Sequence, residues 1–256
     1  MTSSSRGSGS VATRKKIPSR SRTKRKKSIP RSDRFVPAVP PVPPWNRLIR
    51  AFRREALSHL EPVVTRVARN RNPYRVLASC MVSLRTKDEV TAVASKRLFA
   101  IAPDLPALAR ARQASIARAI YPAGFYRTKA KSLRRVARDI IDRFDGRVPD
   151  TIDQLLTLHG VGRKTANLVV SLGYGKPGIC VDTHVHRVSN RLGLCKTRTP
   201  DQTEMVLREV LPGRYWIELN DLLVTYGRNV CTPLSPHCST CRVEGLCPKV
   251  GVTRSR

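Results

Sequence analysis

Apolar residues recur at helical spacing through most of the chain after residue 45. Positions three and four apart repeat in segments that prolines and short polar stretches separate, which is the pattern of amphipathic helices. We predict helices over residues 46–69, 74–84, 88–101, 113–120, 127–144, 151–157, 162–173, 182–192, 201–210 and 214–227. No segment shows the alternation of a half-buried strand, so the pattern predicts an all-α protein.

The first 34 residues lack this pattern. They hold 12 Lys and Arg and one Asp among Ser and Gly, with almost nothing to bury, so we predict a disordered basic tail. A stiff polyproline linker follows from Pro37 to Pro44, and residues 1–44 should therefore precede the fold, which we expect to begin at Trp45. The tail is either a solubilising extension or a nonspecific tether to DNA, and we favour the tether.

The formal net charge of +31 at pH 7 changes the picture further. The tail accounts for +11 of it, which leaves +20 on residues 35–256, so the folded part is itself strongly basic. Such charge indicates a polyanionic partner, most often nucleic acid. No apolar run approaches the length of about 18 residues that spans a bilayer, so we expect no membrane partner. The expected location is the cytoplasm or nucleoid in a bacterium, and the nucleus or mitochondrion in a eukaryote.

The segment from Leu155 to Arg191 carries the candidate chemistry. A helical turn breaks at Gly160-Val161-Gly162, and the next helix starts there with its free N–H groups facing outward. That arrangement binds phosphate without reading bases. Lys164 follows the turn, and Asp182 opens a further helix. An amine and a carboxylate beside a phosphate-binding turn indicate chemistry on a nucleic-acid backbone.

Four of the seven cysteines lie close together near the C-terminus. Cys231, Cys238, Cys241 and Cys247 have the spacing C-x6-C-x2-C-x5-C, and four thiolates this close can enclose one metal centre. The spacing alone leaves both zinc and an iron–sulfur cluster open. The other three, Cys80, Cys180 and Cys195, sit among apolar neighbours, so we predict that they are buried and structural.

Four separated motifs together resemble the endonuclease III family. They are Ser83–Asp88 (SLRTKD), Leu158–Ala166 (LHGVGRKTA), Val181–His184 (VDTH) and the four cysteines, and the resemblance runs from about Pro73 to Cys247. This family consists of bifunctional DNA glycosylases of the helix-hairpin-helix superfamily. Any one motif could arise by chance, whereas all four in this order are highly specific.

The resemblance implies two helical lobes with a DNA-binding cleft between them. Residues 66–176 would form a six-helix barrel, and residues 45–65 with 177–256 would form the other lobe. It also implies that the four cysteines ligate a [4Fe–4S] cluster. The expected partner is double-stranded DNA that contains damaged bases or abasic sites, and the expected oligomeric state is a monomer.

The implied activity is removal of oxidised pyrimidines followed by strand cleavage at the abasic site. Lys164 matches the catalytic lysine, which would displace the base and form a Schiff base before β-elimination. The alternative to a catalytic role is that Lys164 only contacts a DNA phosphate. Basic neighbours and a helix N-terminus should lower the pKa of its ammonium. Asp182 matches the aspartate that would activate this lysine, and it would also serve as a helix N-cap.

Seven further residues are predicted to contact DNA. Four of them belong to the hairpin, namely Gly160, Gly162, Arg163 and Thr165. Phe125 falls at the position of a wedge residue that enters the duplex when the target base leaves it, although a core aromatic is nearly as good an interpretation. Arg85 stands where the family usually has glutamine, and it would favour guanine as the opposite base. His184 would lie near the abasic sugar, unless it is simply a hydrogen-bonded histidine at a helix start.

Two other functions remain open at this point. Arg85, together with His159 in place of a usual proline, would suit a paralogue that acts mainly as an abasic-site lyase or on mismatched pyrimidines. The other possibility is a noncatalytic, cluster-bearing protein that binds DNA or senses redox state. The Lys164/Asp182 pair argues against the noncatalytic protein.

Overall fold

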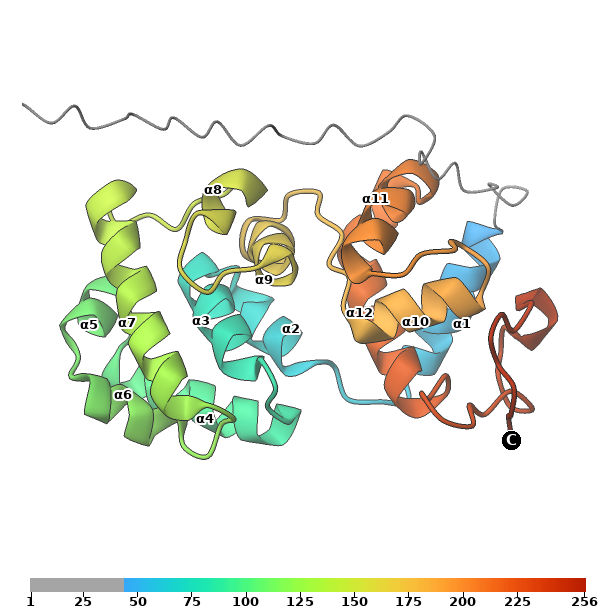
Figure 1. Ribbon diagram of the computed structural model, residues 1–256, viewed down its shortest axis with the longest axis horizontal. Coiled ribbons are helices and arrows are strands. Elements are labelled where there is room, and N and C mark those ends of the chain that lie inside the picture. The colour runs from blue at the N-terminus through green and yellow to red at the C-terminus, as the bar shows by residue number, and fades with distance from the viewer. Residues whose placement is uncertain (1–43) are drawn as a thin grey trace, which may run out of the picture. The chain divides into compact units, whose positions relative to one another are not determined.

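The computed structural model describes residues 44–256, and all regular structure in this part of the chain is helical (Figure 1). The α-helices are α1 (Trp45–Ala56), α2 (Val63–Val67), α3 (Pro73–Ser83), α4 (Asp88–Ile101), α5 (Leu105–Arg110), α6 (Gln113–Ile120), α7 (Tyr126–Arg143), α8 (Ile152–Leu156), α9 (Arg163–Leu168), α10 (Thr183–Arg191), α11 (Pro200–Val210) and α12 (Trp216–Asn229). Shorter turns are the 3-10 helices η2 (Ala68–Asn70), η4 (Gly213–Tyr215) and η5 (Glu244–Leu246), and the π-helix η3 (Val169–Gly173). The all-α prediction is confirmed, whereas the predicted disordered tail lies outside the described residues.

The helix prediction was wrong at two places. The single helix expected over residues 46–69 is broken, because α1 ends at Ala56 and Pro62 caps the separate α2. Proline lacks an N–H and disfavours helical geometry in the residue before it, so a helix cannot run through this point without a kink. The sequence pattern also missed α5, because its prolines were interpreted as separators. Pro106 lies in the first turn of α5, where its missing N–H costs no hydrogen bond.

The buried apolar side chains form two clusters. The first extends from Ala68 to Cys180 and is built on α3 to α9. The second joins Trp45 and its neighbours on α1 to residues of α10, α11 and α12. We therefore keep the division into a barrel of residues 66–176 and a lobe of 45–65 with 177–256 as a proposal that these two clusters support.

The first helix packs against the last ones, which are far from it in sequence (Figure 1). Phe52 of α1 and Tyr226 of α12 meet edge to face with their ring centroids 4.8 Å apart. The indole N–H of Trp45 donates to the carbonyl of Val210 at 2.9 Å. The prediction that order begins at Trp45 agrees with its burial, since only 4% of this residue is exposed.

A close backbone contact fixes the end of the hairpin region against α3. After α9 the chain makes the π-helical turn η3, which ends at Gly173. A Cβ on Gly173 would lie 3.0 Å from the Cα of Pro73, the first residue of α3. A side chain here would push the two backbones apart by a few tenths of an ångström, so glycine suits this close approach of η3 to α3.

The helices of residues 44–256 are all too short or too polar to cross a lipid bilayer.

Candidate active site

The glycine turn predicted from the sequence joins α8 to α9. Val161 donates its N–H to the carbonyl of Leu158 at 3.2 Å, and Ala166 donates to Gly162 at 2.9 Å. Gly160 has φ of +76°, a left-handed conformation that favours glycine. Gly160 and Gly162 are exposed, so the start of α9 faces outward as predicted.

Lys164, the second residue of α9, faces Asp182 at the start of α10. Their Nζ and Oδ2 atoms are 3.5 Å apart. The other carboxylate oxygen of Asp182 accepts the N–H groups of His184 at 2.8 Å and Val185 at 3.0 Å. Asp182 therefore caps α10 and faces Lys164 at the same time, and the cap holds the carboxylate in the orientation that the contact requires.

The predicted pKa of Lys164 was wrong in direction. Burial lowers the pKa of this ammonium, but the Asp182 carboxylate opposes burial, and the pKa lies above its usual value. The carboxylate at 3.5 Å is missing from a sequence-based argument that considers only basic neighbours and the helix end. In the free protein Lys164 is therefore a protonated side chain, of which 44% is exposed.

Two buried thiols stand behind this lysine. Cys80 and Cys180 are each 2% exposed, and Cys195 is buried as well, so the prediction of three buried cysteines is confirmed. Burial raises the pKa of Cys80 to about 12 and that of Cys180 well above its usual value, although Lys164 opposes both shifts. Both thiols are therefore neutral at physiological pH. Nothing in their sequence spacing indicated that they neighbour Lys164.

The other polar hairpin residues are directed into the protein. The guanidinium of Arg163 donates to both carboxylate oxygens of Glu204, at 3.0 and 2.6 Å. Glu204 is 2% exposed and also accepts from Arg208 at 2.9 Å. Thr165 is 3% exposed. Thr165 could thus contact DNA only through its backbone. The guanidinium of Arg163 is already paired with Glu204, a partner that the sequence analysis did not identify.

Arg85 and Phe125 come together on the surface. Both have left-handed backbones, with φ of 53° and 55°, and the Arg85 guanidinium lies 5.7 Å from the centre of the Phe125 ring. Phe125 is 63% exposed, so the alternative of a core aromatic was wrong. A cavity of about 390 Å³ extends from these two side chains to Gly160. The structure thereby joins the two predicted wedge residues to the hairpin turn.

His184 is packed between α10 and α12. Its Nδ1 lies 3.2 Å from Nη2 of Arg187, which also donates to the carbonyl of Gly227 at 2.8 Å. A Cβ on Gly227 would lie 2.8 Å from the same Nδ1, so only glycine fits there. Burial lowers the pKa of His184, and the nearby arginines add to that effect although Asp182 opposes it. His184 is thus a neutral, half-buried side chain next to the Lys164/Asp182 pair.

All four C-terminal cysteines line one small cavity of about 30 Å³ with mostly apolar walls. Arg191 Nη1 donates to Cys231 Sγ and the Lys249 N–H donates to Cys247 Sγ, each at 3.4 Å, and the Tyr226 hydroxyl shares a hydrogen bond with Cys241 Sγ at 3.0 Å. Within residues 44–256 no three His, Cys, Asp or Glu side chains are arranged to hold a single metal ion. The four thiols border one cavity, and N–H donors to sulfur are typical of cysteines that ligate metal.

Two arginines of α10 bind the segment that carries these cysteines. Arg187 donates to the carbonyl of Cys231 at 3.1 Å through Nε. Arg191 donates to the carbonyls of Thr232 and Pro233 at 2.7 and 2.8 Å. The helix that begins beside Asp182 therefore ends on the cysteine segment.

Comparison with known proteins agrees with this geometry. Residues 78–213, more than half of the chain, match the model of the HhH-GPD superfamily base excision DNA repair protein. Endonuclease III of Thermotoga maritima is 44% identical over 188 residues, which cover 72% of this chain and 88% of that protein. Endonuclease III of Synechocystis is 37% identical, with 75% and 88% covered. A solved endonuclease III–DNA covalent intermediate with an estranged adenine has a TM-score of 0.69 at 32% identity, covering 80% of this chain and 95% of its own.

The chain belongs to the endonuclease III family.

Membership of the endonuclease III family makes this chain a base excision repair enzyme, a DNA glycosylase and abasic-site lyase that binds DNA. The predicted family, fold class and class of enzyme are confirmed. The noncatalytic alternative was wrong. The roles of individual residues remain predictions, and the geometry above is what supports them.

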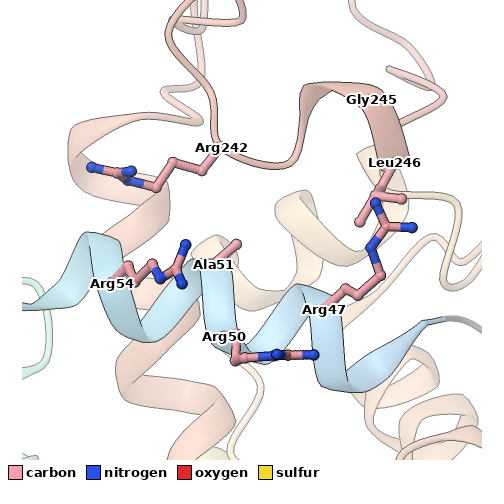
Figure 2. Close-up of a pocket in the computed structure, with 7 residues that line it drawn as sticks. All are labelled: Arg47, Arg50, Ala51, Arg54, Arg242, Gly245 and Leu246. Carbon is pink, nitrogen blue, oxygen red and sulfur yellow. The ribbon is translucent and has the colours of Figure 1, made fainter.

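A second basic feature lies on α1 (Figure 2). A groove of about 540 Å³ separates the exposed face of α1 from the segment between Cys241 and Cys247. Arginines line both sides, namely Arg47, Arg50 and Arg54 on α1 and Arg242 on the opposite segment. The excess of positive charge that the sequence shows is therefore not confined to the hairpin.

Proposed function

We propose that this DNA glycosylase and abasic-site lyase removes oxidised pyrimidines, such as thymine glycol, from double-stranded DNA with Lys164 as its nucleophile. The observation that carries the proposal is the 3.5 Å contact between Lys164 Nζ and Asp182 Oδ2. It places an amine and a carboxylate at the starts of two helices, beside the exposed glycine turn. Such a pair can form and break bonds at a sugar carbon.

The first chemical step needs a neutral amine. Because Lys164 is protonated in the free protein, a proton must leave Nζ before attack, and the Asp182 carboxylate is the acceptor in reach. The amine then forms a bond to C1′ of the target nucleotide, and the base leaves with the electron pair of the C1′–N bond. Asp182 returns the proton to the departing base.

Strand cleavage follows from the same attachment. The C1′–O4′ bond then breaks and O4′ takes a proton from Nζ, which leaves a protonated Schiff base between Nζ and C1′ and makes the C2′ proton acidic. Water accepts the C2′ proton, and the 3′ phosphate leaves with the electron pair of its C–O bond. Water then hydrolyses the imine and frees Lys164.

The surrounding residues would hold the DNA open. We propose that the backbone N–H groups at Gly160 and Gly162 bind a phosphate. Phe125 and Arg85, which lie together on the surface, would fill the space left by the flipped base. The guanidinium of Arg85 suits the two acceptors of guanine on the opposite strand. His184 would stand near the abasic sugar as a neutral side chain.

A [4Fe–4S] cluster fits the four cysteines, because all four thiols border one cavity and several N–H and O–H groups point at their sulfurs. Cys231, Cys238, Cys241 and Cys247 would hold it. Bound there, the cluster would cross-link the C-terminal segment, which Arg187 and Arg191 attach to α10. The enzyme would act as a monomer in the compartment that holds its DNA, the nucleoid of a bacterium or the nucleus or mitochondrion of a eukaryote.

Borohydride trapping tests the nucleophile directly. A duplex with one thymine glycol is incubated with borohydride and either the wild type, Lys164→Ala or Lys176→Ala. Lys176 is the matched control, because it is another half-exposed lysine paired with an aspartate, Asp150. We expect a covalent adduct with the wild type and the control and none with Lys164→Ala. An adduct that persists with Lys164→Ala would exclude Lys164 as the nucleophile.

The lyase-type paralogue is the second candidate, and Arg85 in place of glutamine favours it. It predicts adducts on duplexes with a preformed abasic site but none on thymine glycol. A panel of thymine glycol, abasic and mismatched pyrimidine duplexes, each opposite guanine and adenine, separates the two functions.

A further inference from the structure

A second lysine, Lys129 in the first turn of α7, has no role in this chemistry and yet is buried. Only 8% of it is exposed. Its ammonium donates to the carbonyls of Val82 at 2.7 Å and Leu84 at 2.5 Å, and to the hydroxyl of Thr86 at 2.8 Å. A buried ammonium without a carboxylate costs folding free energy unless its hydrogen bonds are all made. Here all three of its N–H groups are used.

The hydroxyl of Thr86 extends this network to a second loop. It accepts the N–H of Gly124 at 3.1 Å, while it also accepts from Lys129 and donates to the Leu84 carbonyl at 3.3 Å. A Cβ on Gly124 would lie 2.5 Å from the carbonyl oxygen of Arg85, so the two backbones touch here and only glycine fits. Lys129 therefore joins the loop after α3 to the loop before α7 from the inside.

These two loops carry Arg85 and Phe125. Both residues have positive φ, although neither is glycine, and a non-glycine residue keeps that conformation only where its surroundings enforce it. Arg85 lies between Leu84 and Thr86, two of the groups that Lys129 holds, and Phe125 follows Gly124. The backbone N–H of Lys129 donates to the carbonyl of Phe125 at 2.9 Å, at the start of α7.

We propose that Lys129 is a positioning residue for DNA, which holds Arg85 and Phe125 from within the protein in the arrangement that enters the duplex. This inference rests on the proposed function. Lys129 does not touch the substrate. It acts on steps that require opening of a duplex, and it leaves the Schiff-base chemistry of Lys164 unaffected.

A comparison of substrates separates positioning from chemistry. Borohydride trapping rates are measured on an abasic site in a duplex and on the same abasic site in a single strand, which needs no wedge. The variant is Lys129→Met, and the control is Lys131→Met, an exposed lysine of the same helix. Because Met leaves three acceptors without a donor, we expect the rate on the duplex to fall about tenfold or more. The rate on the single strand should stay within about twofold, as should both rates of the control.

A spectroscopic signal reports the wedge itself. A 2-aminopurine opposite the abasic site becomes brighter when it is unstacked, and this rise should be lost with Lys129→Met. Because Lys129 acts through Arg85 and Phe125, adding Lys129→Met to the variant Arg85→Ala/Phe125→Ala should cause no further loss of duplex activity.

Several outcomes would overturn the inference. Equal losses on single strand and duplex would make Lys129 a general folding residue, and unchanged rates on both would leave it without function. Should Lys129→Met fail to fold, Thr86→Val and Thr86→Ser replace it. The inference then requires that Val loses duplex activity and that Ser retains it. A wild type that forms no adduct on either substrate would refute the proposed function, and this inference with it.

Discussion

The two lysines differ in exposure and in the partners of their ammonium groups, and their pKa values shift in opposite directions. Lys164 is half-exposed, yet Asp182 raises the pKa of its ammonium, whereas Lys129 is buried among neutral oxygens and burial lowers its pKa to about 8. A search for an amine that is easily deprotonated would select Lys129. Its three N–H groups all donate hydrogen bonds, so its conversion to a neutral nucleophile would break at least one of them. Access together with a carboxylate partner supports Lys164 as the proposed nucleophile, whereas the pKa alone would favour Lys129.

The difference between the two lysines depends most on Asp182. Substitution of Asp182 should therefore have the largest effect on the rate of base excision. Asp182→Asn retains an oxygen that can cap α10 but removes the acceptor for the Lys164 proton. We expect the single-turnover rate of base excision to fall about 100-fold or more, as for loss of a general base. The melting temperature should change little. Asp182→Ala should show the same loss of rate and, in addition, cost about 1 kcal/mol of folding free energy through the lost cap. A rate for Asp182→Asn equal to wild type would show that another group takes the proton.

The pH dependence of the chemical step sharpens the comparison next. In the proposed mechanism the proton passes from Lys164 to Asp182 and then to the base, so it never leaves the site. Because the pKa of Lys164 lies above its usual value, the site keeps this proton at physiological pH, and the wild-type single-turnover rate should be nearly flat between about pH 6 and 9. In Asp182→Asn the neutral amine forms only by loss of the proton to solvent, so the low residual rate should rise about tenfold per pH unit over this range. A wild-type rate that rises as steeply as that of the variant would contradict proton transfer within the pair.

The smallest expected effect concerns Lys129 and folding stability. Its pKa is about 8 in the folded protein and near the ordinary value of 10.5 in the unfolded chain. The unfolded chain therefore binds more protons between these values, and stability contributed by Lys129 rises as pH increases through this window and is lost as pH falls below about 8. Denaturant unfolding at pH 7.5 and 9.5, for wild type and Lys129→Met, should show a gain of about 2 kcal/mol that only the wild type has. An equal change in both proteins would assign the gain to other groups.

Features that depend on neighbours along the chain could be predicted from the sequence. The glycine turn, the cap at Asp182 and the four cysteines are defined within short motifs, and the structure has the turn and the cap where they were predicted. The missed helix α5 and the break before Pro62 also depend on local sequence, and they were missed because proline both starts helices and ends them.

Features that depend on partners far along the chain could not be predicted. Glu204 pairs with Arg163, from which it is 41 residues apart in the sequence, and Lys129 donates to the carbonyl of Val82, 47 residues away. The direction of the pKa shift of Lys164 was missed for a related reason. A pKa depends on the distances to nearby charges and on burial, and neither can be measured along a sequence.

The length of helix α10 is constrained by contacts at both of its ends. Its nine residues begin next to Asp182, which faces Lys164. They end at Arg191, which donates a hydrogen bond to the carbonyl of Thr232 in the cysteine segment. One inserted residue would lengthen the helix by about 1.5 Å and turn its far end by about 100°. Arg191 would then face away from its carbonyl partners. An insertion or deletion within α10 should therefore disrupt either the Lys164/Asp182 pair or the contacts of Arg191 with the cysteine segment.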